Sequence, residues 1–220
     1  MTLAAVPVKD LANAKQRLIR ILSPWQRREL ARAMLEDVLG ALGGAGLDGV
    51  VVVTRDPDVM ALARRFAMTI LIEPENRGHT EAVALAQRHA TQTGTTRFLT
   101  IPGDVPRVTA AEIRAVCEAA GSGPAVVLVP SWSGFGTNAA LLAPPDLMAL
   151  KFGEPSFENH LNAARERGLE PRVLRLPGLG LDIDGPEDLA ALVEGEGTTR
   201  SAHLLRSWHP PSPHRGEGPR

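Results

Sequence analysis

Two aspartates one residue apart are the residues of this chain with the clearest chemical potential. Asp182 and Asp184 flank Ile183, and Gly185 and Pro186 follow at once as the signal of a helix start. Alternate side chains of an extended backbone point to the same face, so the two carboxylates are expected to lie together. Hard oxygen ligands of this kind suit Mg²⁺, which takes one or two carboxylates together with water and substrate phosphates. A solvated turn and a helix N-cap would explain the same residues without a metal.

A cationic loop follows the first expected strand, Leu3–Val8. Lys9, Lys15 and Arg17 lie on the segment that joins this strand to a helix, and ligands of open α/β sheets bind at that edge. Lysine offers phosphate a point charge and arginine a bidentate fork. The chain contains no G-x-x-x-x-G-K motif, so side chains rather than a P-loop would hold a triphosphate. A solvated basic loop is the alternative interpretation.

Two further polar residues occupy turns at expected element ends. Asp104 follows the strand expected over Arg97–Ile101, at the same carboxyl edge as the cationic loop, where it would complete a Mg²⁺ site with the aspartate pair. Asp104 could instead stabilise only its own turn. Ser156 offers a hydroxyl at a helix start, where free N–H groups favour an anion. N-capping alone explains Ser156 equally well.

Short β-branched runs alternate with helical patterns along the first half of the chain. This β-α-β-α order predicts an α/β protein with a parallel sheet and helices on both faces. The expected strands are Leu3–Val8, Val50–Thr54, Thr69–Ile72, Arg97–Ile101, Val126–Val129, Asn138–Leu142, Ala149–Phe152 and Arg172–Leu176. The expected helices are Pro24–Leu42, Asp58–Phe66, Thr80–Ala90, one capped by Thr109 that ends near Ala120, Ser156–Arg167 and Glu187–Glu194.

The composition is that of an ordinary globular protein. The 220 residues carry a net charge of −1, which argues against a surface that binds nucleic acid. The single cysteine, Cys117, lies in an apolar helical pattern and is expected in the core, so neither a disulfide nor a cysteine metal cluster is available within one chain. No leader pattern or apolar stretch of membrane-spanning length occurs, and we expect a cytoplasmic protein with no membrane partner.

We expect one domain over residues 1–195 and a disordered tail over residues 196–220. Arg206–Arg220 is rich in proline, glycine and basic residues and has no apolar periodicity. Such a segment cannot bury enough surface to offset its ordering entropy. His203, His209 and His214 occur in this region, but their irregular spacing favours a flexible tail over a metal site.

Six segments between about Val6 and Leu192 carry a family resemblance. In chain order they are PVKDLANAKQRL, LSPWQRRELARAMLEDVL, IPGDVP, GTNAALLAPP, FGEPSFENHLNAA and LPGLGLDIDGPEDLAAL. With these segments the chain resembles the 2-phospho-L-lactate guanylyltransferase family of coenzyme F420 biosynthesis, which has phosphoenolpyruvate-using and 3-phosphoglycerate-using branches. The resemblance implies a GT-A/Rossmann-like three-layer α/β/α nucleotidyltransferase fold with a mixed, mostly parallel sheet.

The resemblance also implies roles for particular residues. Lys15 would contact the phosphates of GTP, with Lys9 and Arg17 nearby. The carboxylates that would hold Mg²⁺ and, with Lys15, form the catalytic set are Asp104, Asp182 and Asp184. The residues that would bind the phosphorylated acid are Thr137, Gly153 and Ser156.

The chain departs from the family pattern at Arg77–Val83, where a Gly-Leu-Asn-like segment is usual. If this segment contacts the nucleotide, with Gly78 against it, the choice of base is open. Glu81 would place an extra negative charge near the phosphates or offer a base a hydrogen-bond acceptor. A helix start capped by Thr80 is the structural alternative. Gly103 and Phe135 are milder departures.

The implied reaction is attack by a substrate phosphate oxygen on the α-phosphorus of a nucleoside triphosphate, which expels pyrophosphate. The nucleophile is already anionic, so the main barrier is repulsion between two polyanions, and Mg²⁺ with Lys15 would offset it. Another GT-A-like nucleotidyltransferase, a glycosyltransferase and a non-catalytic nucleotide-binding module are the alternatives. The sequence does not distinguish phospholactate, phosphoenolpyruvate and 3-phosphoglycerate as acceptors, and it leaves a homodimer open.

Overall fold

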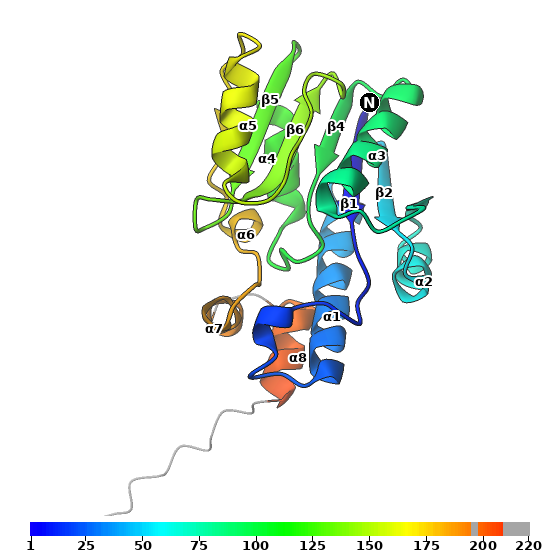
Figure 1. Ribbon diagram of the computed structural model, residues 1–220, viewed down its shortest axis with the longest axis vertical. Helices are drawn as coiled ribbons and strands as arrows, with labels where there is room; N and C mark the ends of the chain where they lie inside the picture. Colours follow the sequence, from blue (N-terminus) through cyan, green and yellow to red (C-terminus); the bar gives the residue numbers. More distant parts are fainter. Residues whose placement is uncertain (195–197, 209–220) are drawn as a thin grey trace, which may run out of the picture.

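The computed structural model describes residues 1–194 and 198–208, which are built around one mixed sheet (Figure 1). The strands are β1 (Thr2–Pro7), β2 (Gly49–Thr54), β3 (Thr69–Ile72), β4 (Arg97–Thr100), β5 (Ala125–Pro130), β6 (Thr137–Ala143) and β7 (Arg172–Val173). Their order across the sheet is β3-β2-β1-β4-β6-β5-β7. β6 runs antiparallel to its neighbours β4 and β5, whereas the other neighbouring pairs are parallel. The expectation of a mixed, mostly parallel sheet is confirmed.

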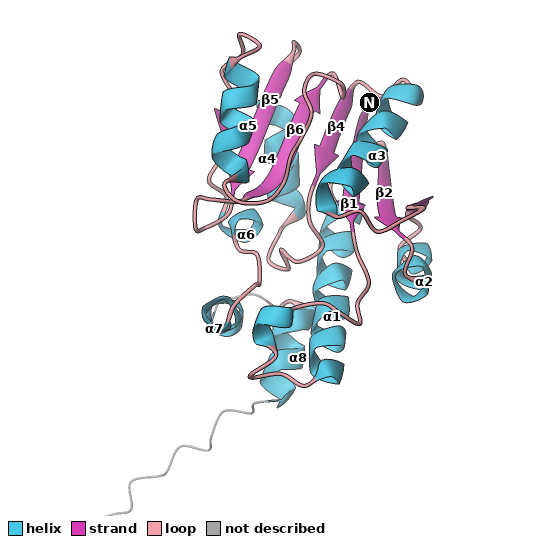
Figure 2. Ribbon diagram, in the orientation of Figure 1, coloured by secondary structure: helices cyan, strands magenta, loops and turns pink. Residues whose placement is uncertain are grey.

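Helices cover both faces of this sheet (Figure 2). On one face lie α1 (Pro24–Gly43), α2 (Pro57–Arg65) and α4 (Ala110–Ala119), and on the other α3 (His79–Gln92) and α5 (Ser156–Arg165). Strand alternation separates the two apolar clusters, because Ala4 and Val6 of β1 join the first and Ala5 joins the second. Cys117 is half-buried at the edge of the first cluster. The three-layer α/β/α architecture follows from this packing.

The capping residues read from the sequence begin two of these helices. Ser23 accepts the backbone N–H of Gln26, whose side chain accepts the N–H of Ser23 at the start of α1. Thr109 and Glu112 form the same reciprocal pair at the start of α4. Each capping box satisfies N–H groups that have no partner inside the helix.

The remaining helices include one that contradicts the expected disordered tail. They are η1 (Gln16–Leu18), α6 (Pro177–Gly180), α7 (Pro186–Glu194) and α8 (Arg200–Trp208). The prediction of disorder from residue 196 is wrong for Arg200–Trp208, and the tail predicted over 209–220, with His209 and His214, lies outside the described residues. Among the described residues, no helix is both long and apolar enough to cross a membrane.

Contacts with α1 explain why α8 is ordered. The carboxylate of Asp37 accepts hydrogen bonds from the backbone N–H of Arg200, at 2.8 Å, and from the hydroxyl of Ser201, at 2.7 Å. Leu205 is buried in the first apolar cluster, and Trp208 lies 5.7 Å from Trp25 between ring centroids. These tertiary contacts offset the ordering entropy that the local composition cannot.

Two expected strands also differ from the observed elements. No strand forms over Ala149–Phe152, because the N–H of Lys151 donates to the ring of His160 and the N–H of Phe152 donates to Thr80. The strand expected over Arg172–Leu176 is short and comprises Arg172–Val173, paired with β5.

Candidate active site

The predicted site residues gather at one edge of the sheet, where β1 and β4 end and β6 begins. The loop after β1 carries Lys15, and the loop after β4 carries Asp104. Because β6 is antiparallel to β4, its first residues, Thr137 and Asn138, lie at the same edge. β1 is flanked by β2 and β4, so the order of strands reverses beside β1. Ligands of open α/β sheets bind at such a switch point.

Lys15 lies between two of the predicted carboxylates. Its Nζ is 2.6 Å from Asp104 Oδ2 and 3.4 Å from Asp184 Oδ1, and its side chain is only 8% exposed. Burial would lower the pKa of Lys15, but the two carboxylates raise it above the ordinary value. Burial would likewise raise the pKa of Asp104, but the ammonium group lowers it below the ordinary value. Both groups are therefore charged at neutral pH.

The backbone of Lys15 is in the left-handed region, with a φ of 54°. This conformation is uncommon for a residue with a side chain and persists only where surrounding contacts hold it. The buried ion pairs with Asp104 and Asp184 are such contacts. The loop thus holds the ammonium group in place at a local conformational cost.

Asp182 and Asp184 are both partly exposed, on either side of the fully buried Ile183. The N–H of Ile183 donates to the carbonyl of Asp104 at 3.1 Å, and the Ile183 side chain is fully buried. Asn138 Nδ2 donates to Asp182 Oδ1 at 3.0 Å. Burial raises the pKa of Asp182, and the charges of Asp104 and Asp184 add to this rise against the opposing Asn138 bond. The ammonium group of Lys15 contacts two of these three carboxylates, Asp104 and Asp184.

Asp188 fixes the backbone of the second aspartate. Its Oδ2 accepts hydrogen bonds from the N–H groups of Asp184, at 2.9 Å, and Gly185, at 2.7 Å. The carboxylate therefore satisfies donors at the start of α7 that have no partner within the helix. The exposed Arg17 adds a weaker contact from outside, with its guanidinium 3.4 Å from Asp184 Oδ2.

A cavity of about 540 Å³ opens beside this cluster. The predicted nucleotide-binding residue Lys9 lines it together with Lys15, Asp104 and Asp184. His79, at the first turn of α3, also lines it. Burial lowers the pKa of His79; the charge of Asp104 opposes this shift and that of Lys9 adds to it. The cavity is within the usual size range of ligand pockets, and both cationic and carboxylate side chains line it.

Helix α3 begins differently from the alternative read from the sequence. Its N-cap is Gly78, with a φ of 102°, and Thr80 is not the cap. A positive φ of this kind favours glycine. The Thr80 hydroxyl instead accepts the N–H of Phe152 at 2.9 Å. This bond ties the start of α3 to the loop before α5.

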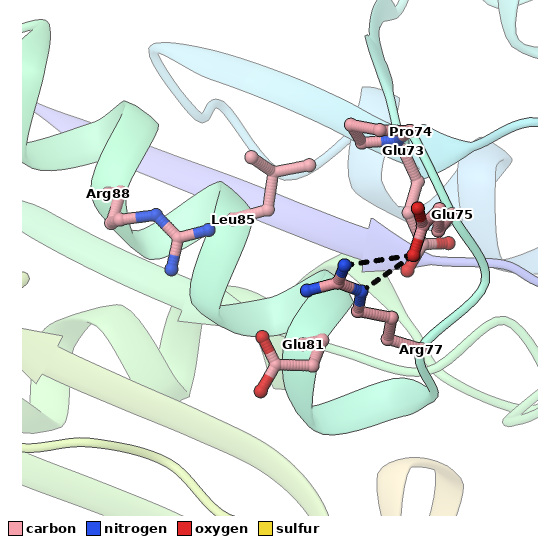
Figure 3. Close-up of a pocket in the computed structure, with 7 residues that line it drawn as sticks. All are labelled: Glu73, Pro74, Glu75, Arg77, Glu81, Leu85 and Arg88. Atoms are coloured by element: carbon pink, nitrogen blue, oxygen red, sulfur yellow. Dashed lines mark hydrogen bonds and ion pairs between the residues drawn. The ribbon is translucent and has the colours of Figure 1, made fainter.

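A second cavity, of about 220 Å³, lies beside the outer face of α3 (Figure 3). Its lining residues are Glu73, Pro74, Glu75, Arg77, Glu81, Leu85 and Arg88. Figure 3 shows Arg77 paired with Glu75, at 2.9 Å. Burial raises the pKa of Glu73 above the ordinary value. Glu81 thus lines a cavity separate from the one that holds Lys15.

Two of the predicted acceptor-binding residues, Thr137 and Ser156, form a buried hydrogen-bonded cluster with His160. Ser156 Oγ accepts the N–H of Thr137 at 3.0 Å, and Thr137 Oγ1 lies 2.9 Å from His160 Nδ1. Burial lowers the pKa of His160 to about 4. Gly153 lies in the loop before α5 with a φ of 110°, a conformation that favours glycine.

The three predicted metal ligands are not arranged as a metal centre. Among the described residues, no group of three or more His, Cys, Asp and Glu side chains is placed to hold a metal ion. The ammonium group of Lys15 instead sits between Asp104 and Asp184. The donors still fit Mg²⁺ chemically, because two carboxylates converge on one cation and Mg²⁺ takes few carboxylates when phosphates and water complete its shell.

Three residues of the site were not predicted as functional. Asn138 holds Asp182, Asp188 holds the backbone of Asp184, and His160 contacts Thr137. Asn138 and His160 stand in the GTN and FGEPSFENH segments, which is the signal that could have found them. The pairings join residues far apart in the chain, so spacing alone does not show them.

Solved structures with this architecture identify the class of fold. A putative nucleotide-diphospho-sugar transferase from Desulfovibrio desulfuricans matches with a TM-score of 0.76 and 17% identity, covering 94% of each chain. A nucleotidyl transferase from Methanothermobacter thermautotrophicus matches with a TM-score of 0.65 and 21% identity, covering 94% of this chain and 99% of its own. The fold is therefore that of the GT-A-like nucleotidyltransferases.

Sequence comparison places the chain within one family of this class. The family model described as "Guanylyl transferase CofC like" matches residues 2–210, and the chain belongs to this family. A phosphoenolpyruvate guanylyltransferase of Rubrobacter xylanophilus is 42% identical over 86% of this chain and 92% of its own. A 2-phospho-L-lactate guanylyltransferase of Methanothermobacter thermautotrophicus is 36% identical over 98% of this chain and 95% of its own.

Proposed function

We propose that this protein transfers GMP from GTP to the phosphate group of a small phosphorylated carboxylic acid in coenzyme F420 biosynthesis. The observation that carries the proposal is the buried ammonium group of Lys15, 2.6 Å from Asp104 and 3.4 Å from Asp184 beside the cavity. Membership of the guanylyl transferase family supports GTP as the donor. The cytoplasmic location predicted above agrees with a reaction that uses GTP.

The acceptor that we propose to test first is phosphoenolpyruvate. Relatives that are 42%, 41% and 39% identical to this chain are named phosphoenolpyruvate guanylyltransferases. A relative that is 36% identical is named for 2-phospho-L-lactate. The two acids share a carboxylate beside a phosphate ester, so residues that bind one are chemically suited to the other. Thr137, Gly153 and Ser156 are the proposed acceptor-binding residues.

In the proposed reaction, an acceptor phosphate oxygen attacks the α-phosphorus of GTP. A bond forms between this oxygen and the α-phosphorus, and the bond from the α-phosphorus to the bridging oxygen breaks, which releases pyrophosphate. The nucleophile is an anion at neutral pH, so no general base is required. The protein instead positions two polyanions and neutralises their charge.

Lys15 is the residue that we propose for neutralising the phosphates of GTP, with Lys9 and Arg17 nearby and Gly78 against the nucleotide. Asp104, Asp182 and Asp184 are the proposed source of carboxylate ligands for Mg²⁺. When bound, the ion would supply positive charge to the phosphates and the leaving group. Movement of the Lys15 side chain towards the phosphates of GTP would leave the carboxylates of Asp104 and Asp184 available to Mg²⁺.

Pyrophosphate release by the purified protein tests the proposal directly. GTP, ATP and CTP are each paired with phosphoenolpyruvate, 2-phospho-L-lactate and 3-phosphoglycerate in the presence of Mg²⁺. The expected result is release with GTP and phosphoenolpyruvate that depends on both substrates. Release from a nucleoside triphosphate without an acceptor, or no release with any pair, contradicts the proposal.

A further inference from the structure

The ring of His160 uses both of its nitrogens in buried hydrogen bonds. Nε2 lies 3.0 Å from the backbone nitrogen of Lys151, and Nδ1 lies 2.9 Å from Thr137 Oγ1. The residue is 1% exposed, so water does not replace either partner. The two contacts join the loop before α5 to the first residue of β6 through the histidine side chain.

The identity of the partners determines where the ring carries its proton. The backbone N–H of Lys151 can only donate, so Nε2 must present a lone pair to it. Burial lowers the pKa of His160 to about 4, so the ring is neutral near pH 7. A neutral ring with a lone pair on Nε2 carries its proton on Nδ1.

This tautomer determines the role of the Thr137 hydroxyl. The Nδ1–H of His160 donates to Thr137 Oγ1, so that contact does not use the hydroxyl's own proton. Ser156 Oγ lies 3.4 Å from Thr137 Oγ1 as a donor and accepts the N–H of Thr137 at 3.0 Å. Both neighbours therefore present hydrogens to Thr137 Oγ1, and the Thr137 O–H is left to donate elsewhere.

The position of Thr137 brings this donor to the edge of the sheet that carries the carboxylates. Thr137 directly precedes Asn138, whose side chain contacts Asp182 at 3.0 Å. Adjacent residues of a strand face opposite sides. Thr137 therefore lies next to Asn138, the residue whose side chain contacts Asp182, at the end of β6 where the carboxylates gather.

We propose that His160 is a positioning residue that turns the Thr137 hydroxyl into a donor for an anionic oxygen of the acceptor acid. The proposal rests on the function proposed above and adds a residue to it. Through the N–H of Lys151, the same ring also holds the loop of Gly153 against β6. Acceptor binding should therefore depend on His160 more than GTP binding does, because the phosphates of GTP are proposed to bind at Lys15.

Substitutions that keep or remove the Nδ1 donor test this role. His160→Leu removes both ring contacts, and His160→Asn retains an N–H near the position of Nδ1. We expect His160→Leu to raise the KM for phosphoenolpyruvate about 10- to 100-fold, as for loss of a hydrogen bond to a charged group. The KM for GTP should change less than about twofold, and His160→Asn should restore part of the loss. Equal effects on both KM values, or no rescue by asparagine, would overturn the proposal.

A double-mutant cycle with Thr137 separates positioning from general disruption. Thr137→Val removes the hydroxyl and keeps the shape of the side chain. If His160 acts through this hydroxyl, His160→Leu should add nothing to the KM for phosphoenolpyruvate in the Thr137→Val protein. Fully additive effects contradict the proposal, because they would mean that the two residues act independently.

Two measurements do not need turnover, and the first of them does not need a variant. Nitrogen-15 NMR of the unaltered protein should find His160 in the Nδ1–H form near pH 7, and the Nε2–H form would overturn the proposal. Calorimetry should show phosphoenolpyruvate binding that weakens in His160→Asn and more so in His160→Leu. No binding to the unaltered protein, or equal binding to all three, also overturns it. Failure of the transferase function appears separately, as bound acceptor without pyrophosphate release.

Discussion

Asn138 donates a hydrogen bond from Nδ2 to Asp182 Oδ1 at 3.0 Å, across 44 residues of sequence. The same amide nitrogen lies 3.0 Å from the carbonyls of Leu179 and Gly180, so it also holds the short helix α6 that precedes the aspartates. The side chain is buried, and it lowers the pKa of a carboxyl group that burial raises. Asn138 is thus the link between β6 and the segment that carries the aspartate pair.

Asn138→Ala should lower pyrophosphate release about 10- to 100-fold, the usual effect of removing a residue that orients a ligand. Its loss raises the pKa of Asp182 further, so the acidic limb of kcat/KM should move to higher pH. The measurement is the pH–rate profile of the variant beside that of Asn162→Ala, whose side chain is exposed on α5. An acidic limb at unchanged pH would contradict this prediction.

Lys15→Met should reduce kcat/KM about 100- to 1,000-fold, because one buried cation is lost where negative charge develops. Arg17→Met should have a much smaller effect, since this guanidinium is 72% exposed and solvent screens its charge. Steady-state pyrophosphate release at fixed Mg²⁺ compares the two variants. Equal losses of kcat/KM in the two variants would show that burial of the Lys15 ammonium group does not increase its contribution to catalysis.

Asp182→Asn and Asp184→Asn should each abolish most turnover while circular dichroism and the melting temperature remain close to those of the unaltered protein. Both changes remove charge that a metal ion would balance. Chelation of Mg²⁺ should abolish activity of the unaltered protein, and added Mg²⁺ should restore it. Asp146→Asn, on the surface, is the matched control. An active double variant that does not need Mg²⁺ rules out the carboxylate proposal.

The stability of the protein should fall as the pH drops from about 6.5 to about 4, because the folded pKa of His160 is lowered from 6.5 to about 4. In this window the unfolded chain binds a proton that the folded chain does not, so acid favours unfolding. The contribution of His160 is about 3 kcal/mol at most. Urea unfolding at several pH values should show a weaker pH dependence in His160→Asn and an unchanged one in His203→Gln, whose side chain is exposed. The same dependence of the unfolding free energy on pH in the unaltered protein and in both variants contradicts the prediction.

Local signals in the sequence account for much of the fold. The apolar run Val50–Thr54 and the capping pair Thr109 and Glu112 specify their elements through neighbouring residues alone, and the structure has both. α8 was missed because its order depends on Asp37, which lies 163 residues from Arg200. The strand expected at Ala149–Phe152 was wrong for a related reason, since side chains of distant elements take up its N–H groups.

The site was predictable in its chemistry but not in its contacts. Asp182 and Asp184 stand out because their spacing places both carboxylates on one face of an extended backbone. The ion pair of Lys15 with Asp104 spans 89 residues and follows only from the strand order. The role of His160 is even harder to predict from the sequence. Its partners are a backbone N–H and a hydroxyl, and no sequence spacing indicates such contacts.

The antiparallel direction of β6 has a consequence for how the site tolerates change. Thr137 and Asn138 are consecutive residues, and one contacts His160 while the other contacts Asp182. A shift of β6 by a single residue would exchange their faces and break both contacts together. The pairing of β6 with β5 runs from Ala143 opposite Ala125 to Thr137 opposite Pro130. This register therefore fixes the positions of Thr137 and Asn138 in the site. An insertion within this pairing would mislocate the two halves of the site at once, whereas one in the preceding turn at Ser133 and Gly134 would leave both in place.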